Sequence, residues 1–147
     1  MRALLQRTSA AEVRVDGEVV GRIGPGLVVL LGVGRHDGPE QAQTLARKVA
    51  KLRVFEDEDG RMNRSLTDVD GAALIVPQFT LYADTRRGNR PGFGEAAPPE
   101  TADRLVRTFA EALADHGVTI AHGTFQATMQ VDLVNEGPVT IWLDTDA

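Results

Sequence analysis

The run LVVLLGV, Leu27 to Val33, decides the fold class of this 147-residue chain. It is far shorter than the ~20 apolar residues of a membrane helix. Glycine-containing turns bound it on both sides, which is typical of a β-strand with two buried faces. Such a strand needs a covering layer on each side. We therefore expect a layered α/β protein with this strand inside it.

The segments on either side of this strand predict more sheet. AEVRVDGEVVGRI reads as a β-hairpin around Asp16-Gly17. Ala72 to Leu81, AALIVPQFTL, reads as a second buried strand, in which Pro77 must lie at an edge, a bulge or the strand's end. VTIAHG predicts another strand. FQATMQVDLV alternates apolar and polar residues strictly, as a strand with one wet face does, and NEGP is expected to turn the chain into the last strand, VTIWL.

Two segments have helical periodicity. PEQAQTLARKVAKLRVF and PPETADRLVRTFAEALADHG carry apolar residues at spacings of three and four, and Gly117 is a good terminator for the second. The order ββ(β)–α–β–α–βββ predicts helices on one face of the sheet. A second sheet or a dimer partner is then expected on the other face.

Composition limits the function. Hydrophobic residues make up 42% and charged residues 25%, so one domain over residues 1–147 is expected. The net charge of −5 confines any RNA contact to a local patch and argues against a DNA-binding surface. There is no Cys, and the opening MRALLQRT has no signal-peptide core. We expect a cytoplasmic protein that spans no membrane. The three histidines are far apart and no ligand spacing is present, so no metal is expected.

Three features could carry chemistry, and each also has a purely structural interpretation. Gln78 and Thr80 follow an apolar strand, at the edge where α/β sheets place their sites, yet such residues are also common structural elements. The segment 82–98 is long and irregular, and its arginines are either a solvated run or an anion patch. Gly137-Pro138 is either a plain turn or a rigid corner aimed at a ligand. The arginines of segment 82–98 are Arg86, Arg87 and Arg90.

The motifs QFTL (Gln78 to Leu81) and NEGPVT (Asn135 to Thr140) resemble those of the D-aminoacyl-tRNA deacylases, whose patterns are S-Q-F-T-L and N-x-G-P-V-T. The resemblance extends over essentially the whole chain, through the N-terminal ALLQRTSAAEVRVDGEVVGRIGPGLVVLLGV, then GRMNRSL, DTRRGNRPGF and FQATMQVDLVN. It implies a homodimer with a three-layer α/β/β fold, mixed sheets and two helices on one side. It also implies a carboxylic ester hydrolase, without a cofactor, that cleaves D-aminoacyl-tRNA and glycyl-tRNA(Ala).

The resemblance also implies residue roles. The Gly137-Pro138 peptide is cis and enters the partner subunit's site, where it excludes L-amino acids, and Arg7 holds that corner. Phe79 offers its backbone N–H to the reacting carbonyl beside Gln78 and Thr80. Two further sets complete the expected site: Phe125 and Met129 are expected in the substrate pocket, and the clustered Arg86, Arg87 and Arg90 are expected to bind tRNA. Pro77 departs from the family pattern, because it stands where the family has Ser.

The mechanism expected from the residues agrees with these roles. A side-chain nucleophile needs an oriented base, and nothing near Thr80 in the sequence supplies one. The 2′-OH of the tRNA's terminal ribose is adjacent to the ester, and intramolecular groups reach effective molarities of order 10⁵ M. Two alternatives stay open: Thr80 as a covalent nucleophile, and a non-enzymatic module that binds RNA ends.

Overall fold

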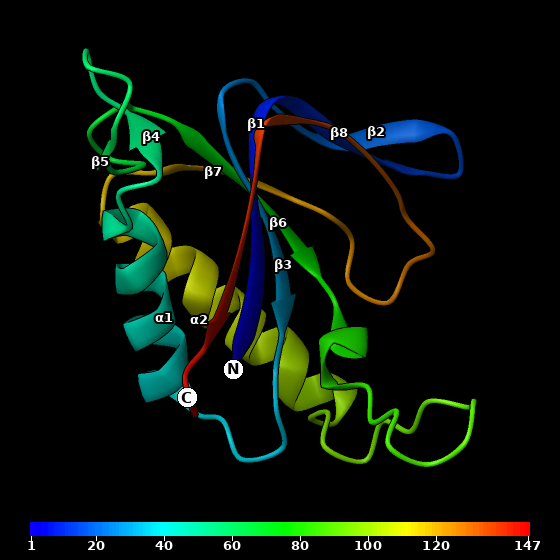
Figure 1. The fold of residues 1–147 in the computed structure, drawn as a ribbon. Helices are drawn as coiled ribbons and strands as arrows, with labels where there is room; N and C mark the ends of the chain where they lie inside the picture. The colour runs from blue at the N-terminus through cyan, green and yellow to red at the C-terminus, as the bar shows by residue number, and fades with distance from the viewer.

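A computed structural model describes residues 1–147, which form two α-helices, eight β-strands and one 3₁₀ turn (Figure 1). The N-terminal elements are a hairpin, a central strand and a helix, and the later strands and the second helix complete the fold. In chain order the elements are β1 (Arg2–Val15), β2 (Glu18–Ile23), β3 (Gly26–Gly32), α1 (Pro39–Lys51), β4 (Phe55–Glu56), β5 (Met62–Arg64), β6 (Ala72–Pro77), the 3₁₀ turn η1 (Phe79–Tyr82), α2 (Pro99–Asp115), β7 (Thr119–His122) and β8 (Gln130–Asp144).

Strand β3 lies inside a six-stranded mixed sheet of order β2-β1-β3-β6-β7, to which β8 adds by pairing with β1. β3 runs antiparallel to β1 and parallel to β6. Its side chains alternate between two cores: Leu27, Val29 and Leu31 face the helices, and Val28 faces the other side. The prediction of a strand buried on both faces is confirmed.

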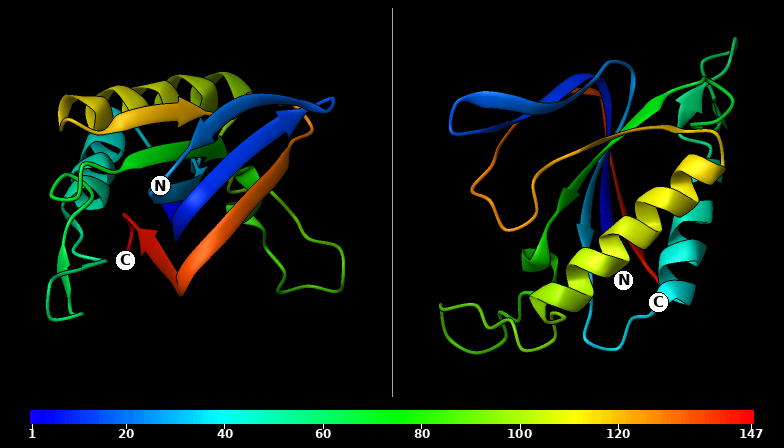
Figure 2. Two further views of the ribbon diagram at one scale, coloured as in Figure 1. Left: turned by 90° about the horizontal axis from the view of Figure 1, so that it is seen from above. Right: turned by 180° about the vertical axis from the view of Figure 1, so that it is seen from behind.

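Strand β1 makes the sheet fold over itself. Its first half lies between β3 and β8, and its second half, from Ala11 onward, lies between β2 and β8. The β2 end therefore packs over β6 and β7, where a Cβ on Gly21 would come within 2.4 Å of the His122 carbonyl oxygen. The result is three layers: helices, central sheet and a second β-layer (Figure 2). The expected α/β/β architecture is confirmed, with the second β-layer supplied by the chain itself.

Both helices cover the same face of the sheet, as predicted (Figure 1). Their apolar stripes pack together and onto β1, β3 and β6 in a core of 22 buried residues, with Phe109 of α2 fully buried. Pro39 occupies the first turn of α1, where its missing N–H costs no helical bond. Gly117 follows α2 with a φ of +89°, a conformation that glycine adopts freely. Neither helix is long and apolar enough to cross a membrane.

Three segments differ from the sequence prediction. The polar turn EDEDGRMN is flanked by a small hairpin, β4–β5. Strand β6 ends at Pro77, and Phe79 to Tyr82 form a 3₁₀ turn where the sequence predicted strand up to Leu81. Pro77 fits at the strand's end because the last β6–β7 pair joins Ile75 to His122, so no ladder partner faces position 77 on that side. The third difference, in Phe125 to Met129, is described with the site.

Candidate functional site

The turn after β6 presents backbone donors at the end of the central sheet. The Gln78 N–H donates to the Leu31 carbonyl oxygen at 2.8 Å and so continues the β3–β6 ladder by one residue. The chain then turns into η1, and a helical turn leaves its first N–H groups without partners inside the turn. None of the backbone hydrogen bonds outside the regular elements uses the Phe79 N–H. Phe79 as a whole residue is 58% exposed, so the rest of the chain does not cover this end of the turn.

Beside this turn lies a cavity of about 820 Å³. It is lined mainly by apolar side chains from β3, β6, α2 and the irregular segments between them. Its wall includes Phe93, whose ring meets the Phe79 ring edge-on with centroids 5.0 Å apart. Arg35 is the one charged residue in the lining. A pocket of this size and composition suits a small, largely apolar organic group that carries one anionic group next to Arg35.

The far wall of the cavity is formed by Phe125 to Met129, which the sequence predicted as the start of a strand. They form an irregular turn with Gln126 at φ +62°, and β8 begins only at Gln130. Pairing explains the difference: Gln130 lies opposite Arg14, near the end of β1, so the residues before it have no strand to pair with. Phe125 and Met129 line the cavity, where the resemblance placed the substrate pocket.

Thr80 lies beside the cavity but has no catalytic base. Its hydroxyl accepts a short hydrogen bond from the Gln78 side-chain amide. This is the one hydrogen bond that the Thr80 hydroxyl makes with another side chain. No His, Asp or Glu lines the cavity. Deprotonating a hydroxyl needs a base within hydrogen-bond reach. The arrangement around Thr80 therefore favours a positioning role for this pair over nucleophilic attack.

Gly137 and Pro138 lie in a bulge of β8 and not in a turn between two strands, as the sequence had suggested. Gln6 of β1 pairs with Thr140, and Thr8 pairs with Asn135, so residues 136–139 lie opposite Arg7 alone. The long strand bends sharply along its length (Figure 2). Gly137 has φ +131°, which few L-residues adopt, and the Gly137–Pro138 peptide is cis, as the resemblance implied.

Arg7 holds this corner from inside the protein. Its side chain is almost fully buried, and Nε donates to the Glu136 carbonyl oxygen at 3.0 Å while Nη1 donates to the Val54 carbonyl oxygen at 2.7 Å. Asn135 supports the other side, because its Oδ1 accepts from the Val139 N–H at 3.0 Å. The backbone on both sides of Gly137-Pro138 is thus fixed, whereas Gly137 and Pro138 themselves are exposed.

The corner and the cavity are separate within one chain. Neither Gly137 nor Pro138 lines the cavity. The bulge lies opposite Arg7, near the β1–β3 pair Thr8–Gly26, whereas η1 follows the pair Leu31–Pro77 at the other end of β3. Figure 1 shows the bend of β8 at the upper end of the sheet and the green 3₁₀ turn at the lower end. Within one chain, the Gly137-Pro138 corner and the cavity therefore lie at opposite ends of the sheet.

The arginine-rich segment closes into a loop at Asp84 and Gly92, whose backbones exchange two hydrogen bonds of 2.7 and 2.9 Å. Within it, the Arg86 guanidinium binds both carboxylate oxygens of Asp84 at 2.8 Å. These hydrogen bonds lower the pKa of Asp84 to about 2, so the pair stays ionised at neutral pH. Arg87 and Arg90 are exposed and form no ion pair.

Arg35 was missed in the sequence because it follows the central strand in a plain turn, GRHDG, with no motif around it. Its N–H donates to the Glu95 carbonyl oxygen at 2.9 Å, and the Ala97 N–H donates to the Val33 carbonyl oxygen at 3.0 Å. These bonds fix the Arg35 backbone at the edge of the cavity. Its exposed guanidinium forms no salt bridge within the chain.

A family model described as D-Tyr-tRNA(Tyr) deacylase matches residues 4–144. The chain belongs to this deacylase family. It is therefore a hydrolase. The D-aminoacyl-tRNA deacylase of Roseiflexus castenholzii is 59% identical over 145 residues, which cover 99% of this chain and 92% of that protein. The one from Ruegeria pomeroyi is 58% identical over 144 residues, covering 98% and 99% of the two chains.

Two solved structures are also similar to this deacylase-family chain. A c-Myc DNA unwinding element binding protein is 40% identical, with a TM-score of 0.93 and full coverage of both chains. A probable eukaryotic D-amino acid tRNA deacylase is 18% identical, with a TM-score of 0.80 and 97% coverage of both chains, and shares the fold.

Proposed function

We propose that the chain hydrolyses the ester of D-aminoacyl-tRNA, and of glycyl-tRNA(Ala), releasing the D-amino acid or glycine and free tRNA. The observation that carries this proposal is the apolar cavity beside the open Phe79 N–H, in a chain of the deacylase family. The aminoacyl group would occupy the cavity between Phe93 and Met129. The relatives' names specify D-aminoacyl-tRNA as their substrate, which supports the same substrate class here.

In the catalytic step the substrate's own 2′-OH would orient and activate a water that attacks the ester carbonyl, and the ribose 3′-oxygen would leave as a hydroxyl with a proton from that water. The cavity supplies no acid–base side chain, whereas the vicinal 2′-OH of the terminal ribose is held next to the ester carbonyl. The protein's contribution is the Phe79 N–H, which would donate to the oxyanion that forms on that carbonyl. One oxyanion donor is worth roughly 3 kcal/mol of barrier. Gln78 and Thr80 hold each other beside the reacting group.

Selection against L-amino acids would come from Gly137-Pro138 of a second copy of the chain. The corner is exposed, is held from behind by Arg7, and lies away from its own cavity, so a homodimer is the arrangement that could bring it to a cavity. A stiff backbone wall excludes a misplaced side chain through a clash, which discriminates better than attractive contacts do. Glycine escapes this wall because it has no Cβ.

The tRNA backbone would be bound by the exposed arginines. Of the three loop arginines, Arg87 and Arg90 are free to bind phosphate, whereas Arg86 is already paired with Asp84. Neutralising Arg87 and Arg90 together should weaken tRNA binding and flatten its dependence on salt, while Arg86→Gln should do less. A loss of tRNA binding in Arg86→Gln as large as that in the Arg87 and Arg90 double variant would refute this assignment.

The deciding experiment is ester loss from D-aminoacyl-tRNA, L-aminoacyl-tRNA and glycyl-tRNA(Ala), each measured against buffer. No acceleration with the D-substrate would leave an RNA-end-binding module as the better interpretation. Thr80→Ala should deacylate at a near-normal rate, and a loss of 10³-fold or more would restore the covalent route. Pro138→Ala should admit L-substrates, because the corner loses its rigid ring. Sedimentation of the wild type should show a dimer.

A further inference from the structure

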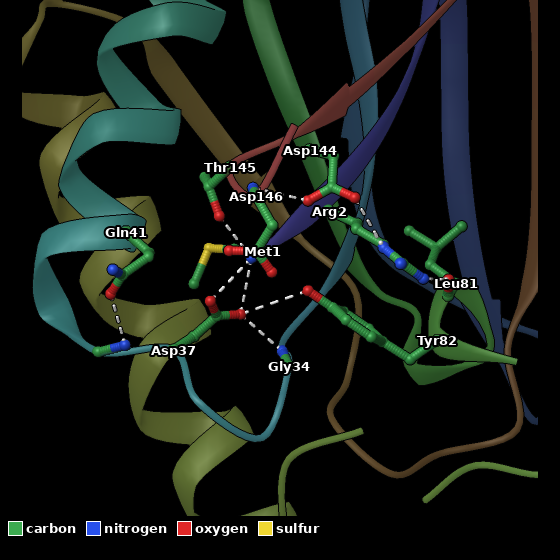
Figure 3. A network of polar contacts seen from close by, with 11 residues as sticks. Met1, Arg2, Gly34, Asp37, Gln41, Leu81, Tyr82, Asp144, Thr145 and Asp146 are labelled. Carbon is green, nitrogen blue, oxygen red and sulfur yellow. Dashed lines mark hydrogen bonds and ion pairs between the residues drawn. The ribbon is translucent and has the colours of Figure 1, made fainter. Parts of the chain in front are cut away.

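We propose that Arg2 is a positioning residue for deacylation, because its guanidinium sets the orientation of the η1 turn that carries the Phe79 N–H. The inference rests on the proposed function and assigns a role to a residue outside the cavity lining. Arg2 Nη1 donates to the Leu81 carbonyl oxygen at 2.9 Å (Figure 3). Leu81 lies two residues after Phe79 in the same four-residue turn.

The η1 turn has few other anchors. At its start the Gln78 N–H bonds to Leu31 of β3, and at its end Tyr82 is buried, while the Phe79 ring between them packs edge-on against the Phe93 ring. The orientation of the Phe79 N–H is therefore set by the two ends of the turn. Arg2 contacts both residues at the second end, because its guanidinium carbon also lies 4.3 Å from the centre of the Tyr82 ring.

Arg2 is itself held on its other side. Its Nε donates to Asp144 Oδ2 at 3.1 Å, and the Asp144 side chain is only 13% exposed. The Trp142 ring lies 5.6 Å from the guanidinium carbon, so the group is placed between two aromatic rings. Asp144 and Trp142 both belong to β8. The guanidinium thus ties the turn beside the cavity to the last strand of the same chain.

The hydroxyl end of the Tyr82 ring lies next to the buried carboxylate of Asp37. Asp37 accepts from the Gly34 N–H at 2.6 Å and from the Met1 amino group at 2.8 Å, and the Tyr82 hydroxyl lies 3.4 Å from it (Figure 3). Burial raises the pKa of Tyr82 above its ordinary value, so the phenol stays protonated and can donate to Asp37. Arg2 therefore stacks on a ring that cannot easily move.

The geometry requires arginine rather than any cation. A guanidinium donates from Nε and Nη1 in different directions while its flat face stacks on an aromatic ring. A lysine ammonium at the same place could neutralise Asp144 but could not bind the Leu81 carbonyl and stack on the Tyr82 ring together. The positioning role thus predicts that lysine fails to replace Arg2, whereas a role in attracting tRNA by charge predicts that lysine succeeds.

The test is steady-state deacylation of D-aminoacyl-tRNA by the 147-residue chain and its variants, which yields kcat and KM. Removing an oxyanion donor costs about 10²- to 10³-fold in kcat, and a misplaced donor should cost less. We expect Arg2→Lys to lower kcat about 10- to 100-fold with KM within twofold of the wild type. Asp144→Asn keeps the Leu81 contact and should lower kcat by only a few-fold. Arg47→Met, on the exposed surface of α1, is the matched control and should change neither constant.

Three outcomes would overturn the role. The first is an unchanged kcat in folded Arg2→Lys and Asp144→Asn. The second is a loss of activity in Arg2→Met that is absent from Arg2→Lys. The third is a rise in KM at constant kcat. Folding of each variant is checked by far-UV circular dichroism, and Asp144→Asn keeps the test decisive where an Arg2 variant does not fold. Wild-type activity is measured first, so failure of the proposed function would appear there, separately from any result on Arg2.

Discussion

Replacing Arg7 with Met should reveal how firmly the Gly137-Pro138 corner is held. The substitution keeps a long, unbranched side chain but removes two charge-assisted hydrogen bonds, to the carbonyl oxygens of Glu136 and Val54. Each such bond contributes about 1.5–3 kcal/mol, and both carbonyl groups would be left without these donors. Relief from burying a charge offsets part of this loss. We expect the free energy of unfolding to fall by about 3 kcal/mol.

The third contact of Arg7 adds little to this magnitude. Its Nη2 lies 3.7 Å from Glu56 Oε1, and the Glu56 side chain is 57% exposed, so solvent screens the pair. With a urea m-value of about 2 kcal/mol per molar, the unfolding midpoint should fall by about 1.5 M. Protein concentration must be equal in all samples, because the stability of the proposed dimer would depend on it. Arg107→Met removes an exposed pair with Asp103 on α2 and should cost less than about 0.5 kcal/mol.

The same variant tests the link between the corner and substrate selection. Without Arg7, the Glu136 carbonyl is no longer fixed and the wall formed by the corner can yield to an L-side chain. The ratio of D- to L-aminoacyl-tRNA deacylation should therefore fall, with a smaller change in the D-rate itself. A stability loss below about 1 kcal/mol together with an unchanged ratio would refute the argument that Arg7 holds the corner.

Three further predictions follow from local geometry. Gly137→Ala should cost about 2 kcal/mol, because φ is +131° and the new Cβ would lie 2.8 Å from Val139 Cγ2; an unfolding midpoint equal to the wild type would contradict this. In an NMR titration Asp84 should titrate at about pH 2, so its pairing with Arg86 persists above that pH and is lost as the pH falls through it. Arg86→Gln should return the pKa of Asp84 toward the ordinary range. An unchanged pKa in that variant would show that the pair with Arg86 does not cause the shift. Phe109→Ala should cost about 3–5 kcal/mol in chemical denaturation, and less than 1 kcal/mol would mean that the core around it collapses freely.

Segments with a strong local signal were predicted correctly from the sequence. The hairpin at Asp16-Gly17 forms because both residues take positive φ, of 51° and 81°, which Asp and Gly tolerate. The strand in the apolar run from Leu27 to Val33 follows from its length and the turns that bound it, and both helices follow from periodicity. In each case the information that sets the structure lies within the segment.

The errors fall where a distant partner sets the structure. The alternation from Phe125 to Met129 fits a strand, but β1 ends before it could pair with them. NEGP has the composition of a turn, yet pairing with β1 on both sides keeps it within one bulged strand. Sequence patterns report local preference, whereas the structure at these positions depends on which distant segment of the chain pairs with them.

Strand β1 contacts both the η1 turn and the Gly137-Pro138 corner, which lie at opposite ends of the sheet. Arg2 and Arg7 are an odd number of positions apart, so their side chains leave the strand on opposite faces, and a rise of about 3.3 Å per residue separates them by about 16 Å. Arg2 holds the Leu81 carbonyl of the turn, and Arg7 holds the Glu136 carbonyl of the corner. If the corner serves the partner's cavity and the turn serves its own, one strand supports catalysis in one site and selection in the other. At that separation their effects on stability should add, so rate and selectivity can change independently.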